Sequence, residues 1–287
     1  MKKRIVEIDQ LSQIAFNARI ECLKMAKNGG CFLGASLSCI DVVVYLYGRY
    51  LNITPETVND KKRDYLFLSK GHDVPALYSV LVEYGFLKRE RLDNHLNKND
   101  FIYWHPNTNI NGIEFHSGSL GHLPSVSLGY AYDLKLRNSK SKVVTIVGDG
   151  ELNEGTVWES LLTANSLKIN NFIMIVDRNK FQANGPTEEI IPLEPLEEKF
   201  KSFNCEVHKV DGHSFEDLEK TFKSINHENF STKVIICNTV RGKGIPSIEA
   251  KADKWFLSLN EEMYSKLLEE LNSGRESGVE LPSTCVR

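Results

Sequence analysis

Short apolar runs alternate with helical patterns along this chain of 287 residues. The runs at 65–68, 143–147 and 172–176 are apolar at nearly every position, as expected of parallel strands that are buried on both faces. Between the last two runs, residues 156–168 place Val157, Leu161, Leu162 and Leu167 at helical spacing. This pattern predicts a strand, a helix and a second strand in succession.

Other segments extend the alternation over most of the chain. We expect further helices at 9–27, 36–51 and 75–84, a helix starting near Ser214, and further strands at 206–210 and 233–237. The connections include a glycine-rich loop at 28–35, a charged turn at 59–64 and a long loop at 97–114. The sequence therefore predicts an α/β fold with a mostly parallel central sheet flanked by helices on both faces. We expect one domain at 1–272 and a polar C-terminal tail at 273–287.

Two polar side chains follow neighbouring strands of the predicted unit. Asp149 comes after the run that ends at Gly148, and Asn179 comes after the next run. The carboxyl ends of adjacent parallel strands meet at one edge of a sheet, where open α/β folds bind ligands. Carboxylate, amide and carbonyl oxygens suit a magnesium ion that bridges diphosphate oxygens, and Gly148 and Gly150 let backbone N–H groups approach a phosphate. The spacing predicts a magnesium and diphosphate site, although Gly-Asp-Gly alone is more often a strand-to-helix turn.

Composition and charge limit the classes of function. Hydrophobic residues make up 41% of the chain and charged residues 25%, which is typical of a globular protein with a full core. A net charge of −3 gives no electrostatic footprint for nucleic acid, and no apolar run approaches the roughly 20 residues of a membrane helix. Met1–Arg4 is followed by Glu7 and Asp9 rather than by an apolar signal core. We therefore expect a cytoplasmic protein that binds neither nucleic acid nor membrane, with its six cysteines reduced because they form no C-x-x-C pair.

An ordered series of motifs resembles a known family. Gly148-Asp149-Gly150, Trp158-Glu159 and Asn179 resemble the thiamine diphosphate motif of the transketolase family. Further segments resemble the same family in the same order: Leu68-Ser69-Lys70-Gly71-His72, His105-Pro106, Gly118-Ser119-Leu120-Gly121, Thr187-Glu188-Glu189 and Pro192-Leu193-Glu194-Pro195-Leu196. The resemblance covers about residues 10–250, and such an ordered series is more specific than any one motif. It implies a thiamine diphosphate-binding fold.

The resemblance also implies roles for individual residues. The side chains of Asp149 and Asn179 and the backbone carbonyl of Phe181 would bind Mg2+ or Ca2+. His72 and His105 would be catalytic, because the matching histidines face the reactive carbon of the cofactor and the substrate hydroxyls. Besides His72 and Asn179, the residues expected along the cofactor are Gly118, Leu120, Gly150, Glu151, Glu154 and Arg241. Lys243 is the alternative to Arg241 in the same Arg-Gly-Lys-Gly turn.

Simpler roles are open for these side chains when each is considered by itself. His72 could be a residue at the start of a helix, and His105 could be an exposed loop residue. Arg241 and Lys243 are of a type that usually faces solvent, and Glu154 could act only on the dipole of the following helix. Their joint order in one chain favours the functional roles.

The resemblance ends after one domain. Single-chain transketolases carry three consecutive domains, and the glutamate that activates the aminopyrimidine ring of the cofactor comes from the next domain of the opposite protomer. No segment of this chain matches that glutamate. The resemblance therefore implies half of a split enzyme. A second subunit would supply the pyrimidine-binding and C-terminal domains, in a heterotetramer with two copies of each chain.

The chain departs from the family on the substrate side. Phe32 lies in the segment where the family has a first-loop histidine, and Trp255 stands near the position of another. His122 replaces a glutamine of the family. The two apolar replacements remove hydrogen-bond partners for a substrate, whereas the magnesium ligands are intact. We expect transfer of a two-carbon ketol unit in carbohydrate metabolism, with the donor and acceptor left open.

Two other functions are open from the sequence. The α subunit of a thiamine diphosphate-dependent 2-oxo acid dehydrogenase or decarboxylating synthase shares the Gly-Asp-Gly motif, but it usually lacks the Ser-Lys-Gly-His and Leu-Glu-Pro-Leu segments found here. A non-catalytic homologue that binds the cofactor or a partner without turnover is allowed by the missing histidines. Thiamine-dependent turnover in the presence of the second subunit would exclude the latter.

Overall fold

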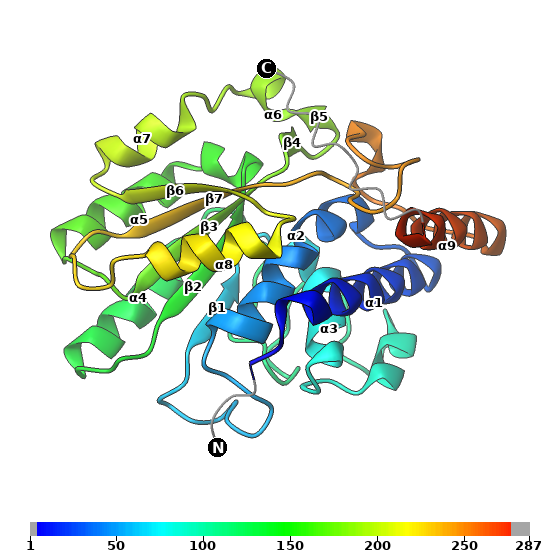
Figure 1. Cartoon of the computed structure of the whole chain (residues 1–287), viewed down its shortest axis with the longest axis horizontal. Helices are drawn as coiled ribbons and strands as arrows, with labels where there is room; N and C mark the ends of the chain where they lie inside the picture. Colours follow the sequence, from blue (N-terminus) through cyan, green and yellow to red (C-terminus); the bar gives the residue numbers. More distant parts are fainter. Residues whose placement is uncertain (1–4, 277–287) are drawn as a thin grey trace.

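A five-stranded parallel sheet forms the centre of the protein (Figure 1). The structure is a computed structural model that describes residues 5–276. The strands are β1 (Tyr65–Leu68), β2 (Val143–Gly148), β3 (Phe172–Arg178), β6 (Glu206–Asp211) and β7 (Lys233–Asn238), in the order β1-β2-β3-β7-β6. Every neighbouring pair is parallel. The predicted α/β fold is confirmed.

Helices cover both faces of the sheet. One apolar core lies between the sheet and α1 (Ile8–Lys27), α2 (Leu33–Tyr45), α3 (Val74–Glu83), α8 (Phe215–Ser224) and α9 (Glu261–Glu276). The other lies against α4 (Leu123–Leu136), α5 (Gly155–Ser166) and α7 (Leu196–Ser202). Along β2, Val144 and Ile146 enter the first core and Val143 and Val147 enter the second. Burial on both faces explains why the strands read as continuous apolar runs.

The second helix begins earlier than the sequence predicted. We expected a loop at 28–35 and a helix opened by Ser36 as its cap, but α2 starts at Leu33. The Ser36 N–H donates to the Phe32 carbonyl at 3.0 Å, so Ser36 lies inside the first turns of the helix. Its hydroxyl is buried and has no hydrogen-bond partner among residues 5–276. The cap assignment was therefore wrong, and after Tyr45 the chain continues as a π-helical turn, Leu46–Tyr50.

Four α-helices, α4, α6 (Thr187–Ile190), α7 and α9, were not predicted. In α4 the apolar side chains do not form one stripe, because Val126, Tyr130 and Leu136 are exposed while Leu123 and Leu128 are buried. That distribution hides the helical period that the prediction relied on. At the C-terminus α9 extends to Glu276, within the predicted tail, and residues 277–287 lie outside the described part of the chain.

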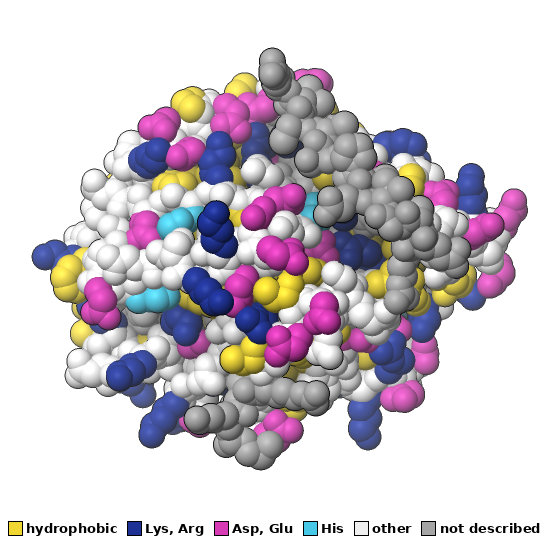
Figure 2. Space-filling model, viewed as in Figure 1, with side chains coloured by type: hydrophobic (Ala, Val, Ile, Leu, Met, Phe, Trp, Pro, Cys, Tyr) yellow, Lys and Arg dark blue, Asp and Glu magenta, His cyan; other side chains and the backbone are white. Residues whose placement is uncertain are grey.

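No helix in the described part of the chain is long and apolar enough to cross a membrane. Acidic and basic side chains are interspersed over the face shown in Figure 2. The cysteines within residues 5–276 are free and buried, namely Cys22, Cys31, Cys39, Cys205 and Cys237, and Cys285 lies outside that range.

A buried ion pair connects α1 and α2 to the turn after β7. Arg19 donates two hydrogen bonds to Asp41, at 3.0 and 2.6 Å, and a third to the Lys243 carbonyl at 3.0 Å. His213 Nε2 accepts from the Val240 N–H at 2.9 Å, so its proton is on Nδ1, which donates to Asp41 at 2.6 Å. Although burial opposes the charge, Arg19 and His213 hold the pKa of Asp41 well below its usual range. The turn that carries Lys243 is thereby attached to two core helices.

We expect the substitution Asp41→Ala to lower the free energy of unfolding by about 3–5 kcal/mol, because it leaves Arg19 buried without its carboxylate. Since the pKa of Asp41 is depressed in the folded state, its contribution is present at neutral pH and decreases as the pH falls below the unfolded value of about 3.9. Urea unfolding measures the change. Asp133→Ala, which removes a carboxylate from the exposed Arg137 pair, is the control and should change stability by less than about 1 kcal/mol.

Candidate active site

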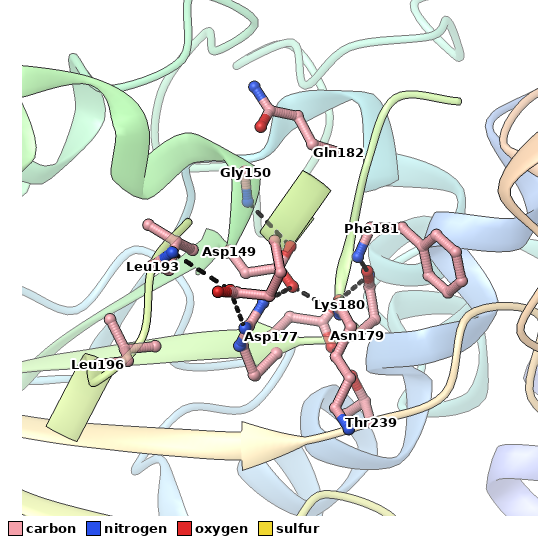
Figure 3. Close-up of polar contacts among 12 residues, drawn as sticks. Asp149, Gly150, Asp177, Asn179, Lys180, Phe181, Gln182, Leu193, Leu196 and Thr239 are labelled. Atoms are coloured by element: carbon pink, nitrogen blue, oxygen red, sulfur yellow. Dashed lines mark hydrogen bonds and ion pairs between the residues drawn. The ribbon is translucent and has the colours of Figure 1, made fainter. Parts of the chain in front are cut away.

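The carboxyl edge of the sheet brings Asp149 and Asn179 to adjacent strand ends. Strands β2 and β3 are neighbours in register, with Gly148 opposite Asp177. Asp149 Oδ1 accepts a hydrogen bond from the Gly150 N–H at 2.8 Å. Its Oδ2 accepts one from the Lys180 N–H at 2.6 Å. Figure 3 shows both bonds, of which the one from Lys180 joins the two turns. The Asp149 carboxylate is therefore attached to the turn that carries Asn179.

Asp149 is a buried carboxylate in an acidic environment. Arg178 Nη1 donates to Asp149 Oδ2 at 3.0 Å, but the same guanidinium also binds Glu188 at 2.6 Å and Glu194 at 3.2 Å. Burial raises the pKa of Asp149 to about 6, against the opposing effect of Arg178. One cation is thus shared among three carboxylates, and a divalent cation fits this excess of negative charge.

The amide of Asn179 has a defined orientation. Its Nδ2 donates to Asp177 Oδ2 at 3.1 Å and to Ser38 Oγ at 3.3 Å, while its Oδ1 accepts from the Phe181 N–H at 3.0 Å. Because the amide nitrogen has two acceptors on one side, the oxygen lies on the other side, by the Phe181 turn. The second lone pair of Oδ1 is available to a metal ion.

A metal ion at this edge would use a mixed set of ligands. Within residues 5–276 no cluster of three or more His, Cys, Asp or Glu side chains could hold a metal ion. One carboxylate, one amide oxygen and a backbone carbonyl are nevertheless a suitable set for a hard cation that is completed by phosphate oxygens and water. The residues present fit a magnesium diphosphate.

A buried ion pair between Lys70 and Asp177 lies at the same edge of the sheet. Lys70, which follows β1, contacts the carboxylates of Asp177 and Asp73. Burial alone would lower the pKa of Lys70, but the two carboxylates outweigh it and raise that pKa well above its usual value. Asp177 also accepts from Ser38 Oγ at 2.5 Å and from the Thr239 hydroxyl. The sequence prediction gave Lys70, Asp73 and Asp177 no role, because only their burial in the fold distinguishes them from ordinary surface charges.

His72 and His105 both lie near the ring of Phe32. His72 lies in the 3-10 turn after β1, and His105 lies in the long loop. The ring of Phe32 is 5.4 Å from the His72 ring and 6.4 Å from the His105 ring, between centroids. A Cβ on Gly118 would be 2.9 Å from His105 Cδ2. Burial lowers the pKa of both histidines, so both are neutral at pH 7.

Aromatic side chains surround these histidines. Phe32 packs on Trp255 at 4.9 Å and on Phe256 at 5.2 Å, and Trp255 packs edge-on to His72 at 5.6 Å, all between ring centroids. The two positions at which the sequence lacks the family's histidines are therefore in contact with each other. They form an apolar wall beside the histidine pair.

The Glu151 carboxylate is buried and accepts hydrogen bonds from neighbouring segments of the chain. Its Oε1 accepts from the Gly121 N–H at 2.8 Å and from the Ser69 hydroxyl, and its Oε2 accepts from the Gly148 N–H at 3.2 Å. Burial raises the pKa of Glu151. The carboxylate connects the loop that contains Gly118 and Leu120 to the end of β2, whereas Glu154 is exposed.

The Arg241 side chain donates hydrogen bonds to backbone carbonyls. It is buried, its Nη1 donates to the carbonyls of Ala183 and Ala252, and its guanidinium lies 4.8 Å from the centre of the Phe181 ring. Lys243 is half-buried in the same turn. Arg241 thus packs directly against the residue predicted to offer a carbonyl to the metal ion.

A parallel α/β domain with carboxylate and amide oxygens at adjacent strand ends is of the class that binds its ligand at the carboxyl edge of the sheet. The sequence model of the family described as transketolase, thiamine diphosphate binding domain, matches residues 12–283, and the chain belongs to this family. An apulose-4-phosphate transketolase subunit from Phocaeicola vulgatus is 34% identical over 254 residues, which are 88% of this chain and 89% of that protein. The 6-deoxy-6-sulfo-D-fructose transketolase subunit SqwG of a Clostridium species is 33% identical over 92% of this chain and 97% of its own length.

Solved structures agree with this assignment. The transketolase from Campylobacter jejuni superposes with a TM-score of 0.84 and 27% identity, over 93% of this chain but only 43% of its own. The chain therefore spans less than half of a single-chain transketolase and nearly all of the subunits named above. It corresponds to the thiamine diphosphate-binding domain of a transketolase, and the two relatives that match it over nearly their full length are named as subunits.

We expect Gly118→Ala to weaken thiamine diphosphate binding by the assembled enzyme about tenfold. The backbone at Gly118 has φ +152, and the added methyl group would collide with the His105 ring, at a cost on the order of 1–3 kcal/mol. Calorimetric titration measures the affinity. The matched control is Gly129→Ala in α4, where nothing lies within 4 Å of the new Cβ and the binding constant should be unchanged.

Proposed function

We propose that this chain is the diphosphate-binding subunit of a two-component transketolase that transfers a two-carbon ketol unit between sugars or sugar derivatives. The observation that carries the proposal is the pairing of Asp149 and Asn179 at the ends of β2 and β3, joined by the hydrogen bond from the Lys180 N–H. The cofactors are thiamine diphosphate and Mg2+, which Ca2+ can replace at an oxygen site of this kind.

Residues of this chain would hold the cofactor by its diphosphate end. Asp149, the Asn179 side chain and the Phe181 carbonyl would bind the metal ion. The other residues proposed to lie along the cofactor are His72, Gly118, Leu120, Gly150, Glu151, Glu154 and Arg241. Because the Glu151 carboxylate is occupied by internal hydrogen bonds, its contribution would be to hold the glycine loop in place. When bound, the cofactor supplies an electron sink for the pair released as a carbon–carbon bond breaks.

The two histidines would handle protons and hydroxyl groups. Both are neutral at pH 7 because burial lowers their pKa, so each ring has a nitrogen that can accept a proton or a hydrogen bond. Their contact with Phe32 limits the water that can compete for those nitrogens. The aromatic wall also leaves the substrate without the two imidazoles found in ordinary transketolases.

A second subunit would complete the enzyme. The relatives that match this chain over nearly their full length are named as subunits, and single-chain transketolases are more than twice as long as the matched region. We propose that the partner supplies the pyrimidine-binding and C-terminal domains in a heterotetramer with two copies of each chain. The buried free thiols are consistent with a protein that works in the reducing cytoplasm.

The other functions are less favoured. The relatives reported above are transketolase subunits rather than 2-oxo acid dehydrogenase subunits. The oxygen ligands at the strand ends and the neutral histidines beside them are all present, which argues against a homologue without catalytic capacity.

We expect Asp149→Ala to abolish Mg2+-dependent binding of thiamine diphosphate by the assembled enzyme, because it removes the one carboxylate of the ligand set. The fold should persist, since Arg178 keeps its pairs with Glu188 and Glu194. Calorimetry with and without Mg2+ is the measurement, and Asp60→Ala in the exposed turn is the control. An unchanged affinity in the Asp149 variant would count against the site.

The purified chain alone should show no ketol transfer, and addition of the partner subunit should produce thiamine-dependent turnover. The reason is that the chain matches only 43% of the single-chain transketolase from Campylobacter jejuni, so the remaining part would have to come from the partner. Co-purification identifies the partner, and ketose donors are then screened with the complex. Turnover by the single polypeptide would refute the division of the active site between two subunits.

A further inference from the structure

Asp73 is a buried carboxylate to which the proposed function gives no role. It follows His72 in the 3-10 turn after β1, and its side chain has no exposed surface. Lys70 makes an ion-pair contact with Oδ2, and Oδ1 lies 3.4 Å from His72 Nε2. Neither oxygen accepts a hydrogen bond from residues 5–276. A buried carboxylate with so few partners is unfavourable for folding, so its presence calls for a reason.

The charges around Asp73 do not balance. One ammonium group, that of Lys70, is shared by the carboxylates of Asp73 and Asp177. Asp177 has further donors in Ser38, Asn179 and Thr239, whereas Asp73 has none of these. The excess negative charge is therefore least compensated at Asp73, next to the His72 ring. A proton on His72 would compensate it.

We propose that Asp73 is the positioning and charge partner of His72, which holds Nε2 toward the protein and stabilises the ring when it carries a proton. This inference rests on the proposed function for the use of His72 in ketol transfer. With Nε2 toward Asp73, Nδ1 is left for the substrate side. A proton accepted there from a substrate hydroxyl gives an imidazolium that faces a carboxylate, and return of the proton restores the neutral ring.

The other groups around His72 act in the opposite direction. Burial is the largest effect and lowers its pKa, and the charges of Lys70, His105 and Arg241 lower it further. Asp73 has the largest effect of the charges acting on this ring, and it raises the pKa. His72 is consequently neutral at rest, and Asp73 reduces the cost of protonating it during turnover.

A purely structural role makes a different prediction. If Asp73 served to neutralise Lys70, its removal would leave a buried cation and destabilise the fold. Lys70 keeps Asp177, however, so loss of the Asp73 charge leaves a balanced pair. Asp73→Asn should therefore leave thermal stability unchanged or raise it, while the proton affinity of His72 falls.

The test is an NMR titration of the histidine-labelled full chain, with the His72 signal assigned from His72→Gln. Asp73→Asn and Asp73→Ala should each lower the pKa of His72 by about one unit, a tenfold loss of proton affinity, because an opposite charge within about 4–6 Å is removed. Asp133→Asn, on the exposed surface of α4, should leave it unchanged. In the complex, the pH profile of kcat/KM should shift to lower pH by the same amount.

Two results would overturn the inference. One is an unchanged His72 titration in both Asp73 variants, and the other is loss of folding in both, which would make Asp73 a structural residue. The titration needs no turnover, so it is independent of the proposed function. If the wild-type complex lacks ketol transfer, the proposed function fails, and the titration still decides whether Asp73 governs the protonation of His72.

Discussion

The Lys70–Asp177 ion pair is the interaction on which the site depends. It runs from the end of β1 to β3 and passes the end of β2 at Gly148, so it joins the three strands that carry His72, Asp149 and Asn179. Because Asp177 also accepts from the Asn179 amide, the charge of Lys70 helps to orient Asn179, the proposed metal ligand, without contacting it. A buried pair of this kind would be unfavourable alone, and the hydroxyl groups that also donate to Asp177 offset its desolvation.

The site has two sides of different chemistry. On the cofactor side, backbone N–H groups, carboxylates and an amide oxygen surround a position suited to a magnesium diphosphate. On the substrate side, Phe32 and Trp255 pack on the histidine pair and offer no hydrogen bonds through their ring faces. Binding of the cofactor and selection of the substrate can therefore vary separately. The two subunits named above, at 34% and 33% identity, carry different substrates in their names, apulose 4-phosphate and 6-deoxy-6-sulfo-D-fructose.

Two kinds of attachment keep this edge rigid. The Arg19–Asp41–His213 network fastens the turn of Lys243 to core helices, and Glu151 fastens the glycine loop to β2. Each centres on a buried carboxylate, Asp41 or Glu151, that accepts several hydrogen bonds, and the groups of such a network stabilise one another. The proposed division of the active site between two subunits would benefit from this attachment, because the residues of this chain would have to be in position before the partner binds.

The sequence by itself determined the strands, the edge of the sheet and the chemistry expected there. Apolar runs such as 172–176 have one stable solution in a chain of this size, a strand buried on both faces, and the polar residue after each run must then lie at the sheet edge. The tertiary structure alone decided the start of α2, the existence of α4, and the roles of Lys70, Asp73 and Asp177. These depend on which groups become buried together. Which polar and charged groups are buried together is a property of contacts between distant segments, and local periodicity does not record it.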